Sequence, residues 1–138
     1  MISVRYVARH AVVASILFNF ASNTSPARAD DGFPFGMAMT LEAAPQPGSK
    51  RVPNLEIGEN GEAVLELWCK AAKGQFSVAG NTVIFVAGQI EDRGCSPAKS
   101  LADDELVADL GAAASWKRQG EFVSFVGAKT LRFRLNTN

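Results

Sequence analysis

The apolar residues of this chain recur at every second position, in short runs that glycine-containing turns separate. The last run shows the pattern most clearly, because Leu131, Phe133 and Leu135 alternate with polar residues. A repeat of two places successive side chains on opposite faces of an extended strand, whereas a helix needs a repeat of about 3.6. The alternation therefore predicts a β-rich domain in which one face of each strand lies in the core.

Turn signals separate these runs at short intervals. Asn60-Gly61 and Gly80-Asn81 are typical of tight hairpins, because both residue types tolerate a positive φ. Hairpins this short join antiparallel strands. We expect irregular chain over residues 45–53 and 88–98. The runs predict about seven or eight short strands, over residues 37–42, 54–58, 62–69, 74–78, 82–87, 115–118, 121–126 and 130–135.

One segment has a helical period instead. Ala102, Leu106, Leu110 and Ala113 follow one another at intervals of four and three, which predicts one apolar helical stripe. The spacing of Ser100 and Asp103 is that of a capping box, and Asp103, Asp104 and Glu105 would then lie in the first turn. These signals predict one helix of about 11 residues that ends at Gly111. The fold class is therefore α+β: a strongly bent, barrel-like antiparallel sheet with one α-helix.

Residues 1–29 are typical of a secretory signal peptide. Arg5 and Arg9 supply a positive start, residues 11–21 form a short apolar stretch, and Ala27 and Ala29 form a cleavage signal. The alternatives are a membrane anchor and a buried helix, although the apolar stretch is short for an anchor. We expect a periplasmic or secreted protein with a flexible lead-in at 30–36, one domain at 37–135, and no transmembrane segment after cleavage.

Cleavage would change the chemistry that the chain can carry out. It removes three of the 14 basic residues and none of the 14 acidic ones, which leaves a net charge of −3. It also removes His10, the only histidine. Without an imidazole there is no Ser-His or Cys-His nucleophile pair and no histidine-ligated zinc site. We therefore expect neither an enzyme nor a bound cofactor or metal, and the absence of a net positive charge argues against nucleic acid as a partner.

Cys69 and Cys95 both lie beyond the predicted cleavage site. In an exported chain, two cysteines most simply form one structural disulfide. Two buried free thiols are the first alternative. A redox pair is the second, although the spacing is not Cys-x-x-Cys and no histidine is near to lower a thiol pKa.

Three side chains are candidates for contact with a ligand or partner: Trp68, Arg132 and Arg134. Trp68 could be a binding aromatic or a core residue. The two arginines would join Lys117 and Arg118 on a basic outer face if the last strands are neighbours; such a face could meet an anionic surface or simply keep the strands soluble. Four acidic residues of the helix could bind a hard cation or form a solvated face: Asp103, Asp104, Glu105 and Asp109.

The region from Trp68 to Phe133 also contains an ordered set of short motifs. These are Cys69, Gly74-Gln75-Phe76, Gly80-Asn81-Thr82-Val83, Cys95, Glu105-Leu106 with Leu110, Trp116, Gly120, Val123, Phe125, Leu131 and Phe133. In order and spacing the set resembles the META-domain family, which includes HslJ-like bacterial heat-shock proteins. The chain departs from that family at its cysteines, where Trp68-Cys69-Lys70 and Arg93-Gly94-Cys95 replace Gly-Cys-Asn and Met-Ala-Cys.

The resemblance implies a bent antiparallel sheet with one helix, and a role in envelope stress and antibiotic tolerance. It implies no catalytic or binding residues. The first functional hypothesis is therefore an exported, non-enzymatic domain that binds an envelope protein. The second is a small barrel that binds a lipid or apolar ligand among its phenylalanines, at Phe76, Phe85, Phe122, Phe125 and Phe133. The third is an inhibitor of a secreted hydrolase that uses the segment 88–98.

Overall fold

The computed structural model describes residues 32–137. These residues form eight strands and one helix, and all strand pairs are antiparallel, which confirms the α+β class. The helix is α1 (Pro97–Gly111), and it follows the fifth strand as predicted. The strands are β1 (Met37–Leu41), β2 (Asn54–Ile57), β3 (Glu62–Glu66), β4 (Ala71–Ala79), β5 (Thr82–Glu91), β6 (Ser115–Gln119), β7 (Phe122–Val126) and β8 (Thr130–Leu135).

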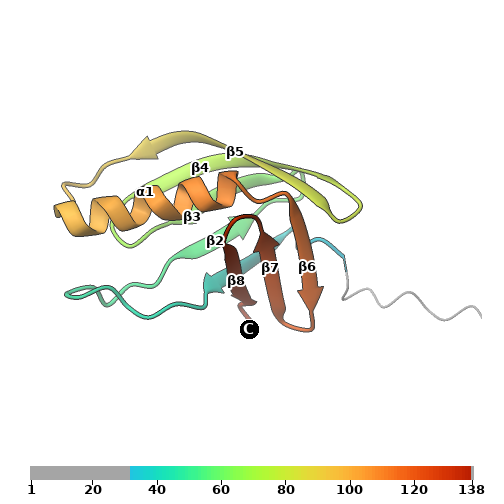
Figure 1. The fold of residues 1–138 in the computed structure, drawn as a ribbon, viewed down its shortest axis with the longest axis horizontal. Helices are drawn as coiled ribbons and strands as arrows, with labels where there is room; N and C mark the ends of the chain where they lie inside the picture. The colour runs from blue at the N-terminus through green and yellow to red at the C-terminus, as the bar shows by residue number, and fades with distance from the viewer. Residues whose placement is uncertain (1–31, 138) are drawn as a thin grey trace, which may run out of the picture.

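Each strand pairs with the next one along the chain, and β8 pairs back with β1. The contact between β5 and β6 is the weakest link in this ring, because Thr82 and Ser115 are its one paired position. Figure 1 shows α1 running alongside the long β4–β5 hairpin, with the β6–β8 meander following its C-terminal end. The helix therefore covers the region where the sheet is least continuous.

The two hairpins that the sequence predicts are present. Gly61 precedes β3 with a φ of 83°, and Gly80 joins β4 to β5 with a φ of 59°. L-residues with a Cβ rarely adopt this region, so glycine permits both reversals. Local turn chemistry therefore positions two of the strand pairs.

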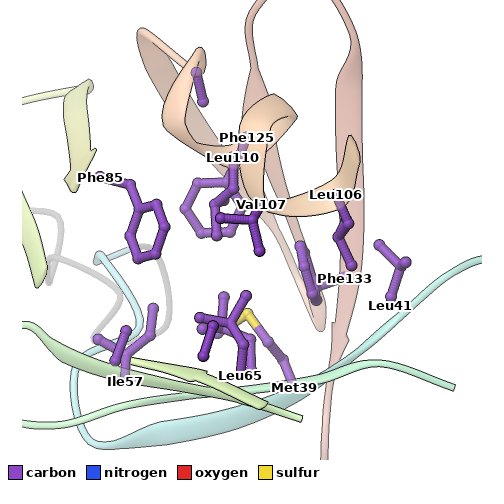
Figure 2. Close-up of a cluster of buried hydrophobic side chains, with 14 of the residues drawn as sticks. Met39, Leu41, Ile57, Leu65, Phe85, Leu106, Val107, Leu110, Phe125 and Phe133 are labelled. Carbon is purple, nitrogen blue, oxygen red and sulfur yellow. The ribbon is translucent and has the colours of Figure 1, made fainter. Parts of the chain in front are cut away.

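The core lies between the strands and the helix. It contains Met39, Leu55 and Leu65 from β1, β2 and β3, together with Phe125 and Phe133 from β7 and β8. All five side chains are buried. Figure 2 shows Leu106, Val107 and Leu110 of α1 facing this cluster. The predicted helical stripe is therefore confirmed as the face that packs on the sheet.

The predicted start of the helix is wrong. The helix begins at Pro97 with Ser96 as its N-cap, so Ser100 lies inside the helix and the first turn holds no acidic residue. A serine followed by proline at the first helical position is also a start signal, because proline has no N–H to leave unpaired. Asp103 therefore falls in the second turn, where its side chain faces the protein interior.

Three strand boundaries also differ from prediction by three or more residues. The strand β3 ends at Glu66 rather than at residue 69, and residues 67–70 form a bend. The strand β4 begins at Ala71 rather than at Gly74, and β5 continues to Glu91 through a segment expected to be irregular. A β-bulge between Ala72 and Gly74 lets this longer ladder form.

Two residues of the predicted lead-in, Phe33 and Pro34, pack against the domain. Pro34 is fully buried, and the Phe33 ring lies against Phe76, Trp116 and Phe125. Aromatic packing therefore attaches this segment to the end of the core. The predicted signal peptide, with Ala27 and Ala29, lies outside the described residues. Within residues 32–137, no helix has the length and apolar character to cross a membrane.

Candidate functional site

A disulfide joins Cys69 in the bend after β3 to Cys95 in the loop before α1. Their Cα atoms are 5.8 Å apart, a separation ordinary for a disulfide. The structural bridge predicted from the two cysteines is therefore confirmed. It ties the edge of the sheet to the start of the helix.

Asp103 holds the same junction from the inside. Its carboxylate accepts backbone hydrogen bonds from Trp68 at 2.7 Å, Cys69 at 3.0 Å and Lys70 at 2.7 Å. The side chain is 0% exposed. A buried carboxylate needs such partners, because its desolvation is otherwise costly. Asp103 is therefore a clamp between α1 and the bend rather than part of a solvated acidic face.

Lys70 adds a charged contact beside this clamp. Its ammonium lies 2.9 Å from the Asp104 carboxylate, and the lysine side chain is only 9% exposed. The hydrogen bond to Asp104 raises the pKa of Lys70 above its ordinary value of 10.5, although burial acts in the opposite direction. Neighbouring carboxylates of α1 therefore have different roles, one receiving backbone N–H groups and the other receiving a cation.

Trp68 lies in the bend and is 6% exposed. Most of its ring belongs to the core cluster, so little of it is available to a large partner. The remainder lines a shallow hollow of about 360 Å³ at the surface. The sequence alone placed Trp68 on a strand face and gave no sign of this bend.

Arg132 and Arg134 lie on the exposed side of β8. The Arg132 guanidinium carbon is 3.9 Å from the centroid of the Phe122 ring, and the Arg134 guanidinium is 3.0 Å from the Glu121 carboxylate. Lys117 shares this face, because β6, β7 and β8 are neighbours and Lys117, Ser124 and Arg132 lie in one row. Both arginines already have partners within the protein.

Arg118 does not join that row. It follows Lys117 directly, so its side chain leaves the strand on the other face. There it donates hydrogen bonds to the carbonyl oxygens of Gly32 and Gly120. The predicted basic face therefore has three cations rather than four, and one of the three pairs with a carboxylate.

The most unusual surface feature is the second half of β5. Every residue from Val86 to Glu91 is exposed, so this part of the strand has no buried face. Val86 is 62% exposed and Ile90 is 43% exposed. On the side away from β4, pairing with β6 stops at Thr82. A long, exposed and partly apolar strand edge is uncommon in folded proteins, because it can pair with another chain.

A groove of about 480 Å³ lies beside this segment. Its apolar residues include Val64 and Ile90, and charges of both signs surround them. The sequence did not reveal the groove, because residues 88–91 carry no alternating pattern and were expected to be irregular. The charged residues that line it are Glu66, Lys73, Glu91 and Arg93.

Within the part of the chain that the structure describes, no group of three or more His, Cys, Asp or Glu side chains could hold a metal ion. Asp103 receives backbone N–H groups, while Asp104 and Asp109 lie near Lys70 and Lys129. The helix carboxylates that the sequence offered as cation ligands therefore do not converge.

No protein-family model matches this chain. No curated protein matches it either. The chain is similar to a protein of known structure solved by NMR, with a TM-score of 0.56 and 17% sequence identity over 72% of this chain and 89% of the other. At this identity the likeness concerns the fold alone.

Proposed function

We propose that this chain is an exported, non-enzymatic binding module of the META/HslJ-like kind, which assists the cell envelope under stress by binding an envelope protein. The exposed half of β5 is the observation that carries this proposal. An extended segment of the partner protein would bind to this half of β5 and add to the sheet as a further strand.

The outer edge of β5 supports strand addition. Val83 still donates its backbone N–H to the carbonyl oxygen of Ala114, but beyond it the strand has no neighbouring strand on that side, so its edge can present main-chain donors and acceptors to an incoming segment. Ile84 and Val86 project from the exposed face with 57% and 62% of their surface free. A partner strand with alternating apolar residues would cover these side chains.

The residues of the neighbouring groove indicate which kind of partner segment the β5 edge would bind. Ile90 and Glu91 belong to β5 itself and offer the added strand an apolar contact and a negative charge, whereas Lys73 lies on β4 and Val64 on β3, on the other side of β5 from the free edge. Charge complementarity contributes to specificity and to correct register. The groove therefore favours a partner segment that has charged residues between apolar ones.

The interior favours this function over the binding of an apolar ligand inside a barrel-like sheet. Phe76 stacks on Phe125 with ring centroids 5.4 Å apart, and Phe85 and Phe133 complete the cluster. These four side chains contact one another instead of lining a space. Phe122, the fifth phenylalanine considered, lies beneath Arg132 on the outer face.

The disulfide supports the exported location. Such bonds persist in oxidising compartments and are rare where thiols are kept reduced. Cys69 and Cys95 are bonded to each other, and no free cysteine is present among the described residues. The predicted signal peptide supplies the route to such a compartment.

The test compares two substitutions of matched chemistry. Val86→Lys places a charge on the proposed edge, whereas Leu101→Lys places the same charge on a helix residue that is 61% exposed. We expect a deletion strain to lose survival under envelope stress. Wild type and Leu101→Lys should restore survival, and Val86→Lys should not, although all three remain folded. A photo-crosslinking residue at position 87 should join the same partner in wild type and Leu101→Lys.

Full rescue by Val86→Lys would overturn the assignment to β5. Normal survival of the deletion strain under every envelope stress applied would overturn the envelope role itself.

A further inference from the structure

Four cations surround the shallow hollow at which Trp68 reaches the surface. Lys50 and Arg51 come from the loop between β1 and β2, Arg93 from the loop before α1, and Lys99 from the first turn of α1. Figure 1 shows that this loop and the start of α1 lie at the same end of the molecule. Residues far apart in the sequence therefore meet at one small concave surface.

Specific contacts hold the rim in place. The Lys99 ammonium donates to the carbonyl oxygen of Gly48 at 3.3 Å, which joins the helix to the loop. The Ser49 hydroxyl accepts from the backbone N–H of Arg51 at 3.2 Å and shapes the turn that presents both basic residues. Cys69 lies in the lining, so the disulfide fixes part of the same surface.

The hollow has more positive than negative charge. No carboxylate lines it. One oxygen of Glu66 accepts from Arg51 at 3.4 Å and from Arg93 at 2.9 Å, and Glu91 lies 3.6 Å from Arg93. Among residues 32–137, Lys50 and Lys99 form no ion pair. Lys70 follows Cys69, and the carboxylates of Asp92, Asp103 and Asp104 act on its ammonium, so the excess of positive charge is confined to the lining of the hollow.

This excess is local, because the chain from residue 30 onward has 14 acidic and 11 basic residues. Surface cations on an acidic protein are ordinarily interspersed with carboxylates. Here the one nearby carboxylate that contacts two of them, Glu66, holds Arg51 and Arg93 at neighbouring positions on the rim. The cations of the lining that have no carboxylate partner could be neutralised by a bound anion.

We propose that this hollow binds a phosphate group, either of a small molecule or of a lipid headgroup. A phosphomonoester carries a charge of about −1.5 to −2 at neutral pH, which the four cations of the lining would attract. The guanidinium groups of Arg51 and Arg93 present N–H donors in the planar geometry that suits phosphate oxygens. Lys50 and Lys99 add two further positive charges at the rim. Of the four cations, only Arg93 also lines the groove beside β5.

The experiment is an NMR titration of the disulfide-bonded protein with inorganic phosphate, and separately with vesicles containing phosphatidic acid or only phosphatidylcholine. The indole N–H of Trp68 and the backbone N–H of Lys99 report on the hollow. We expect saturable shifts at both groups. A Lys50→Gln/Lys99→Gln variant should bind about tenfold more weakly, because it removes two of the attracting charges.

The control variant is Lys117→Gln/Lys129→Gln, which removes the same total charge at positions outside the hollow. It should bind as wild type does. Shifts with inorganic phosphate would identify a small-molecule phosphate, whereas shifts only with phosphatidic acid vesicles would identify a lipid headgroup. Equal weakening in both double variants would overturn the site, since only overall charge would then matter. Absence of saturable shifts with both probes would overturn it as well.

Discussion

The carboxylate of Asp103 lies 2.7 Å from the backbone nitrogen of Trp68, although 35 positions separate the two residues along the chain. The same carboxylate binds the next two backbone N–H groups, so α1 grips the bend after β3 by its main chain. Main-chain donors are present whatever side chains the bend carries. The hydrogen bonds of the clamp therefore depend on the main chain of residues 68–70 and not on their side chains.

We expect Asp103→Ala to destabilise the protein by about 3 kcal/mol, because it leaves buried N–H groups without an acceptor. Urea unfolding monitored by circular dichroism measures this loss. Glu105→Gln is the matched control, since Glu105 lies on the same helix and is exposed; its effect should stay within about 0.5 kcal/mol. Equal stability of Asp103→Ala and wild type would show that the clamp contributes nothing.

Removal of the disulfide should have a comparable effect on stability. The bond closes a loop between positions 26 residues apart, and the double variant Cys69→Ser/Cys95→Ser should lose about 2–4 kcal/mol. Wild type treated with a reductant should show the same midpoint of unfolding as the double variant. If the reduced protein instead unfolds at the wild-type midpoint, the bridge does not stabilise the fold.

Two phenylalanines distinguish the filled interior from the outer face. Phe125 is 0% exposed and contacts Phe76 and Phe133, so Phe125→Ala should cost about 3–5 kcal/mol through the cavity that it leaves. Phe122 lies under Arg132 on the outside, and Phe122→Ala should cost about 1 kcal/mol. Thermal unfolding by calorimetry compares them. Similar losses in both variants would contradict this description of the core.

The Lys70–Asp104 pair predicts a pH dependence in the alkaline range. The pKa of Lys70 is higher in the folded protein than its ordinary value of 10.5, because of the hydrogen bond to Asp104. The pair therefore stabilises the protein fully below pH 10.5, and this contribution declines as the pH rises through the raised folded pKa. The difference in unfolding free energy between wild type and Asp104→Asn should shrink over that range. A difference that grows with pH would reverse the sign expected for this pair.

The alternating residues and turn dipeptides by themselves determined that this chain forms an antiparallel β-rich fold with one amphipathic helix. Leu131 and Phe133 share a face because of strand geometry, and Gly61 and Gly80 permit reversals through their own backbone freedom. These are short-range effects, acting between residues a few positions apart. The spacing of Leu106 and Leu110 predicted the position of the helix along the chain, which is also a short-range effect.

Only the tertiary structure decided where the carboxylates, cations and exposed strand edge lie. Asp103 is buried because a distant bend presents three N–H groups to it, and no local pattern encodes that meeting. The second half of β5 lacks a buried face, so it lacks the alternation by which a strand is recognised in sequence. Lys50 and Lys99 approach one hollow because separate segments converge there. Contacts between distant segments depend on how the whole chain packs, and that information is absent from any short stretch of sequence.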